Sequence, residues 1–187
     1  MGNPNFERNV NVNTAYYLHW RGEDSAAMPF VRRWIELDEH HFRQGGYCPD
    51  GAVMLARIHW ARGDEGEARA VIASIERHQA DARVTGKTEL LLLPNDEMLF
   101  EMTGLLVRDA PAAAWEAFVP RARAVAQGQE VIEVLECAGL AALRREDFAN
   151  ARRWWREALD TAAHLPTVMA GRIATRLAEL ETRVPIE

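Results

Sequence analysis

Histidines and carboxylates gather within one helical turn in the segment ELDEHHF, residues 36–42. Asp38 and His41 lie three residues apart, so on a helix they would share a face and could ligate one metal ion. A complete site needs two further ligands from another helix, and the sequence has no HExxH motif or repeated ExxH to supply them. We therefore interpret this segment as a solvated helix end, with its histidines near the negative end of the helix dipole, and expect no metal.

Gly86, Lys87 and Thr88 match the last three positions of a phosphate-binding loop. The first glycine of that loop is missing, because Asp81 stands in its place, and the segment follows a predicted helix instead of a strand. Nothing in the sequence places a nucleophile on a strained strand-to-helix elbow. We expect no nucleotide site, no cofactor and no enzymatic activity.

The segment ARRWWRE combines arginines with aromatic rings, as nucleic-acid-binding surfaces do. The chain, however, has a formal net charge of −6, whereas binding to nucleic acid requires a net basic face that releases counterions. We interpret Arg152, Arg153 and Arg156 as a solvated helix face. Trp154 would pack against the last helix or, alternatively, contact a partner.

Composition indicates a reducing compartment and a GC-rich bacterial source. Cys48 and Cys137 are far apart and form no CxxC pair, which is typical of buried thiols in the cytosol. Lys87 is the only lysine among 22 basic residues, a bias that we attribute to codon usage. The sequence begins without an apolar run behind a basic lead and has no apolar stretch long enough to span a bilayer. We expect a cytoplasmic protein that does not bind a membrane.

Helical periodicity runs through most of the chain, and no segment alternates for long enough to be a strand. A length of 187 residues with 48% hydrophobic content allows one domain with a substantial core. We predict an all-α single domain, residues 1–187, made of about four antiparallel helical hairpins and a C-terminal capping helix. The hairpins are expected at about 10–42, 51–79, 95–127 and 129–163, and the capping helix at 166–183.

Two similar stretches, LHWRGEDSAA and IHWARGDEGEA, mark the turns of the first two hairpins. Gly22 and Gly63 would take the left-handed turn conformation, which strains other residues. Acidic residues follow each glycine, at the positive end of the next helix. Ala27 and Ala68 are small enough to let the two helices of a hairpin approach closely. The remaining two hairpin turns are predicted at 108–109 and 145–147.

The segment LECAGLAALRREDFANARRWWREAL resembles the tetratricopeptide repeat (TPR) signature. Gly139 matches the small residue of the first helix, and Phe148 matches the aromatic residue that opens the second. The packing positions of the second helix are matched by Ala151, Trp155 and Ala158. The hairpins recur about every 41 residues, as from Ala27 to Ala68, instead of the 34 of a standard TPR, so armadillo- and HEAT-type pairs stay open as alternatives.

The resemblance implies a right-handed solenoid whose concave groove, lined by the first helix of each hairpin, holds a peptide or protein segment. The groove-facing residues would be Asn13, Tyr16, His19, Arg57, Trp60 and Glu136. An Asn side chain can donate to and accept from a peptide backbone, and Tyr and Trp supply large contact areas. The alternative is that Trp20 and Trp60 only pack between hairpins.

These implications favour a non-enzymatic module that binds a protein or peptide, as an adaptor, a dedicated chaperone or the sensor part of a bacterial regulator. The alternative function is a structural, self-associating scaffold, in which exposed apolar residues pair two arrays into a homo-oligomer. An enzyme of unfamiliar helical type is a third reading.

Overall fold

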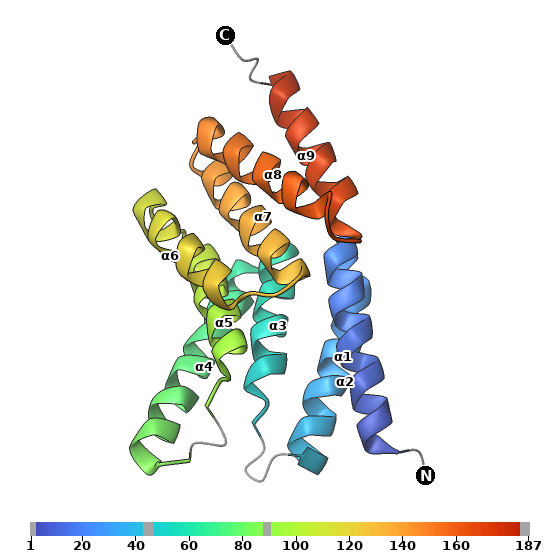
Figure 1. Cartoon of the computed structure of the whole chain (residues 1–187). Helices are drawn as coiled ribbons and strands as arrows, with labels where there is room; N and C mark the ends of the chain where they lie inside the picture. Colours follow the sequence, from blue (N-terminus) through green and yellow to red (C-terminus); the bar gives the residue numbers. More distant parts are fainter. Residues whose placement is uncertain (1–2, 43–46, 88–90, 184–187) are drawn as a thin grey trace. The chain divides into compact units, whose positions relative to one another are not determined.

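A computed structural model of the protein describes residues 3–42, 47–87 and 91–183, so Thr88 of the Gly-Lys-Thr tripeptide lies outside it. Every regular element in this part of the chain is a helix, which confirms the all-α prediction (Figure 1). None of the described helices is long and apolar enough to cross a membrane. Two compact units divide the chain, Met1–Val107 and Arg108–Glu187.

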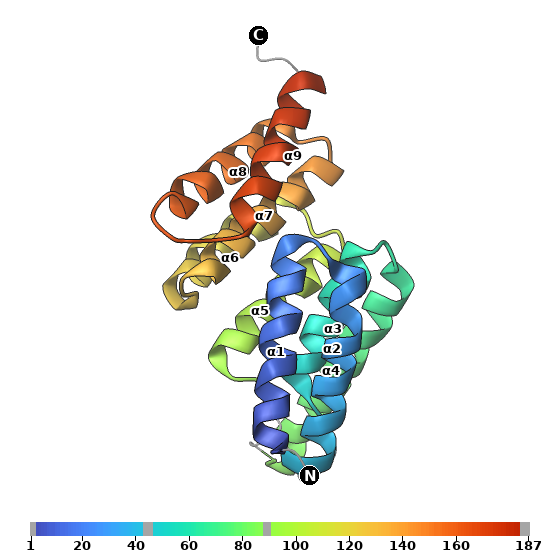
Figure 2. The same ribbon diagram turned by 90° about the vertical axis from the view of Figure 1, so that its right-hand side faces the viewer.

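In the first unit, α2 packs between α1 and α3, and α3 packs against α4 and α5 (Figure 1). Its elements are α1 (Pro4–Arg21), α2 (Asp24–Leu37), the π-helical turn η1 (Asp38–Phe42), α3 (Pro49–Ala61), α4 (Glu65–Thr85) and α5 (Pro94–Val107). In the second unit, α7 packs against α6, α8 and α9 (Figure 2). Its elements are α6 (Ala112–Val125), α7 (Gln129–Arg144), α8 (Phe148–Ala162) and α9 (Met169–Arg183).

The first helix starts at Pro4, before the predicted start, because Asn3 caps it. The Asn3 side-chain oxygen accepts a hydrogen bond from the Asn5 amide at 3.0 Å, and proline is favoured in the first turn. A proline inside a helix is expected to kink or stop it, yet α6 continues past Pro120 to Val125. Pro120 is exposed, so water can satisfy the carbonyl group that lacks its N–H partner.

Three hairpin turns share one backbone geometry, which confirms the predicted turn positions. Gly22, Gly63 and Glu146 adopt left-handed conformations, with φ of 80°, 83° and 59°. The next residue in each turn donates its N–H to the carbonyl five residues earlier, at 2.9 Å in all three cases: Glu23 to Leu18, Asp64 to His59 and Asp147 to Ala142. This is the Schellman bond that ends a helix. The turn between α5 and α6 has Asp109 at φ 51°.

Replacing Glu146 by glycine should raise the free energy of unfolding by about 1 kcal/mol, because a non-glycine residue is strained at positive φ. The matched control is Gly63→Ala, whose added Cβ would meet nothing within 4 Å, so only backbone strain should lower stability there. Urea denaturation of both variants gives the two changes. If both substitutions raised the free energy of unfolding, or both lowered it, the strain argument would be contradicted.

Small residues close the hairpins where the sequence predicts them. Ala27 and Ala68 are fully buried, as the repeat argument requires. Gly139 on α7 lies so close to α8 that an added Cβ would stand 2.2 Å from Trp155 Nε1. That indole N–H donates to the Glu136 carbonyl at 3.2 Å, so the Trp155 ring fits only against glycine.

Candidate binding surface

Tyr16 lies at the centre of an aromatic cluster in the first unit. Its ring centroid is 5.5 Å from that of Trp20 and 6.3 Å from that of Trp34. Trp34 is buried in the core, whereas Tyr16 and Trp20 keep part of their surface exposed. Asn13, one turn earlier on α1, is exposed. Asn13, Tyr16 and Trp20 therefore present an amide and two rings on adjoining positions of one helix.

Arg57 on α3 supports this cluster from inside. Its guanidinium carbon lies 5.9 Å from the centre of the Tyr16 ring, within the range of a cation–π interaction. The residue is only 3% exposed, so it does not present its charge to solvent. Trp60, one turn later, is partly exposed. Of the two residues predicted on this helix, Trp60 is therefore the accessible one.

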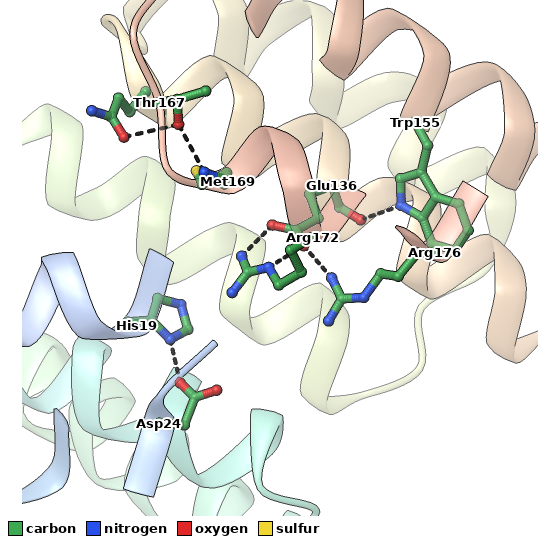
Figure 3. A network of polar contacts seen from close by, with 9 residues as sticks. His19, Asp24, Glu136, Trp155, Thr167, Met169, Arg172 and Arg176 are labelled. Carbon is green, nitrogen blue, oxygen red and sulfur yellow. Dashed lines mark hydrogen bonds and ion pairs between the residues drawn. The ribbon is translucent and has the colours of Figure 1, made fainter. Parts of the chain in front are cut away.

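His19 closes the α1–α2 turn. Its Nδ1 lies 2.5 Å from a carboxylate oxygen of Asp24 (Figure 3). The α3–α4 turn repeats the contact, with His59 Nδ1 3.5 Å from Asp64. Both pairs join residues five apart along the chain, although Asp24 is the first residue of α2 whereas Asp64 is the N-cap residue of α4. The position of His19 favours a structural role over a ligand contact.

Glu136 is a buried ion-pair centre in the second unit (Figure 3). One carboxylate oxygen accepts a hydrogen bond from Arg172 Nε at 2.8 Å, and the other accepts from Arg172 Nη2 at 2.5 Å. Arg176 Nη1 also donates to this carboxylate. Both arginines lie on α9, so Glu136 anchors that helix to α7. The structure places Glu136 in a different unit from the other five predicted site residues.

Asp38 corrects the interpretation of ELDEHHF as a solvated helix end. Its side chain is fully buried and accepts hydrogen bonds from three other residues. Arg8 donates through Nε and, at 3.0 Å, through Nη2. Trp34 Nε1 donates at 3.2 Å and Cys48 Sγ at 3.1 Å. The carboxylate joins α1, α2 and the start of α3, while His41 is exposed.

Electrostatics keep this carboxylate ionised. Burial alone would raise the pKa of Asp38, but hydrogen bonds from Arg8, Cys48 and Trp34 outweigh it, so the pKa lies below its usual 3.8. Burial raises the pKa of the Cys48 thiol, and the hydrogen bond to Asp38 raises it further. Cys48 is therefore a protonated, inaccessible thiol and a poor nucleophile.

The exposed arginines of α8 are engaged in ion pairs. Arg153 pairs with Glu116 on α6, and its guanidinium carbon lies 4.0 Å from the centre of the Trp154 ring. Arg156 pairs with Glu181 on α9 at 2.6 Å. Exposed pairs of this kind contribute little stability, and they leave the face close to neutral. Trp154 itself is buried, which gives no support to a partner contact there.

Sequence reasoning missed Arg8 as a partner of Asp38. A signal was present, since Arg8 lies seven residues before Ala15 and eleven before His19, on the buried face of α1.

Among the described residues, no group of three or more His, Cys, Asp or Glu side chains could hold a metal ion. Comparisons with protein-family models, curated proteins and solved structures found no match. Function therefore has to be inferred from the side chains themselves.

Proposed function

We propose that the chain is a TPR-like, non-enzymatic module that binds an extended segment of another protein. The order in which the helices pack within each unit supports a repeat of helical hairpins. The second helix of a predicted hairpin packs on the next helix along the chain: α2 on α3 and α4 on α5 in one unit, α6 on α7 and α8 on the predicted capping helix α9 in the other. A stack of helical hairpins has this order of contacts.

The partly exposed aromatic cluster on α1 carries the proposal. Tyr16 and Trp20 keep accessible ring surface although Trp34 and Arg57 fix the position of Tyr16. Rings that are held rigid lose little entropy on binding, which is why such residues dominate protein interfaces. Asn13 adds a donor and an acceptor for a peptide backbone. Trp60 extends the predicted surface onto α3.

The proposed ligand is an extended peptide with an apolar or aromatic side chain. The side chain would pack against Tyr16 and Trp20, and its backbone would bond to Asn13. His19 and Glu136 would act indirectly, because they hold helices in place. Arg57 is buried against the Tyr16 ring. Its charge therefore does not face the ligand, and the proposal does not include a carboxylate on the peptide as a partner for it.

Selection from a random peptide library displayed on phage tests the proposal. We expect enrichment of a consensus containing an aromatic or large apolar residue. Asn13→Ala and Tyr16→Leu should each weaken binding of the selected peptide by about tenfold, equivalent to about 1.4 kcal/mol. Fluorescence anisotropy with the synthetic peptide measures this change.

Val84→Ser is the matched control, because Val84 is an exposed apolar residue on α4, away from α1. It should leave peptide affinity unchanged. Thermal unfolding of every variant separates lost binding from lost folding. The melting temperature of Asn13→Ala should equal that of the wild type, because Asn13 is exposed. The proposal fails if no consensus is enriched, or if Asn13→Ala and Tyr16→Leu bind as well as Val84→Ser.

A further inference from the structure

The last helix is held less deeply than its neighbour α7 in the second unit. Of its 15 residues, α9 buries three: Met169, Ile173 and Leu180. In α7, by comparison, ten of 16 residues are buried. A helix with few buried apolar side chains belongs to the part of a structure that opens most readily. α9 is therefore the helix of this unit that we expect to separate from the others first.

The contact between α9 and α7 has a charged centre. Glu136 on α7 is 2% exposed, and the arginines that pair with it, Arg172 and Arg176, both lie on α9 (Figure 3). These arginines are four residues apart, so they project from one face of the helix. A helix that covered Glu136 without a cation would leave a buried charge unpaired, which is strongly destabilising. The surface beneath α9 therefore selects a helix that is cationic at this point.

We propose that α9 is an exchangeable cover, which undocks as a unit while α7 and α8 stay paired, and that the surface it leaves binds a helix of a partner protein. The carboxylate of Glu136 selects this helix as it selects α9. The partner helix carries two arginines one turn apart, with apolar residues at the positions that correspond to Met169, Ile173 and Leu180. α9 blocks the surface until the partner helix displaces it.

The polar contacts of α9 oppose this exchange only weakly. Arg156 on α8 pairs with Glu181 on α9 at 2.6 Å, but the two side chains are 51% and 40% exposed, and pairs of this kind add little stability. When α9 leaves, water solvates its arginines again, which offsets part of the lost attraction. A partner helix with the same residues regains the contacts that α9 gives up. The concentration of the partner and its affinity relative to α9 therefore decide which helix is bound.

Hydrogen exchange of the full chain, followed by mass spectrometry, tests whether α9 undocks by itself. The amides of α9 should exchange about tenfold faster than those of α7 and α8. Their exchange should also depend less on urea, because undocking exposes less surface than global unfolding does. Equal rates and equal urea dependence in the three helices would overturn the proposal.

A labelled peptide of residues 166–183 stands in for the partner helix in fluorescence anisotropy with the full chain. Ile173→Ser weakens the chain's own α9, so this variant should bind the peptide about tenfold more tightly than the wild type does. Leu180→Ser should act in the same direction. Ala174→Ser is the matched control, because Ala174 is exposed on the same helix, and should bind the peptide as the wild type does. Melting temperatures show which variants fold, and no gain in affinity with a folded variant would contradict the exchange.

A second peptide, in which Arg172 and Arg176 are replaced by glutamine, tests the selection by charge. It should bind the Ile173→Ser chain about tenfold more weakly than the first peptide, and adding Glu136→Gln to that chain should remove the difference. Equal binding of the two peptides before Glu136 is changed would overturn the proposal. So would wild-type dimers that Ile173→Ser abolishes, because α9 of a second copy would then be the occupant. Asn13→Ala should leave this binding unchanged, since the inference does not rest on the proposed peptide site of the first unit.

Discussion

Gly139→Ala should lower the free energy of unfolding by about 3 kcal/mol, the upper range for overpacking a core. The added methyl group would stand 2.2 Å from Trp155 Nε1 and 2.4 Å from Cδ1 of the same ring. Trp155 is fully buried, so it cannot move aside without disturbing α8. The shift would also break the hydrogen bond from its indole to the Glu136 carbonyl.

Gly171→Ala is the matched control for Gly139→Ala. Gly171 also lies within a helix, α9, but an added Cβ there meets nothing within 4 Å. Alanine is a better helix former than glycine, so this variant should gain up to about 1 kcal/mol. Chemical denaturation followed by circular dichroism measures both changes. Two stabilised variants would show that the α7–α8 contact is looser than the structure indicates.

Asp38→Asn should lower the free energy of unfolding by about 3 kcal/mol or more, as expected when a buried ion pair loses one partner. The carboxylate accepts hydrogen bonds from Arg8, Trp34 and Cys48. An asparagine amide offers one acceptor oxygen and brings two N–H donors among these donors. The buried site would therefore lose its charge balance and part of its hydrogen bonding. Asp81→Asn, at an exposed position of α4, should change stability by less than about 0.5 kcal/mol.

The pH dependence of stability gives a second measure of Asp38. Its pKa in the folded protein lies below the usual value of 3.8, so folding favours the ionised form. This contribution is fully present above that value and is lost as pH falls through the pKa of the folded state. Thermal melts between pH 7 and pH 2 should show the loss in the wild type and a shallower one in Asp38→Asn. Parallel curves would mean that Asp38 is not the group responsible.

The helical hairpins could be predicted because their signals are local. Glycine, acidic residues and alanine recur at fixed spacing around Gly22 and Gly63. The small residue Gly139 lies in the first helix of its hairpin and the aromatic Trp155 in the second. Each of these features reflects steric limits within one hairpin. That the chain forms a single domain stays a prediction. The right-handed solenoid also stays a prediction, on which the proposed TPR-like function depends.

The environment of Asp38 could not be predicted because it depends on distant residues. Arg8 is 30 positions away along the chain and Cys48 is ten, and only folding brings them together. From sequence alone, a carboxylate beside two histidines is typical of an exposed helix end. The TPR resemblance implies a groove position for Glu136, yet its partners Arg172 and Arg176 come from α9. Register identifies a face, whereas the partner of that face is set by tertiary packing.

The hairpin turns have a consequence for the order of folding. The contacts that close them, such as His19 with Asp24 and His59 with Asp64, join residues five apart. Contacts this local close small loops, so little chain entropy opposes them, and they can form on a fast timescale. The ion pairs of Asp38 and Glu136 close much longer loops. We therefore expect individual hairpins to appear first in refolding, with the buried carboxylates acquiring their partners later, as neighbouring hairpins dock.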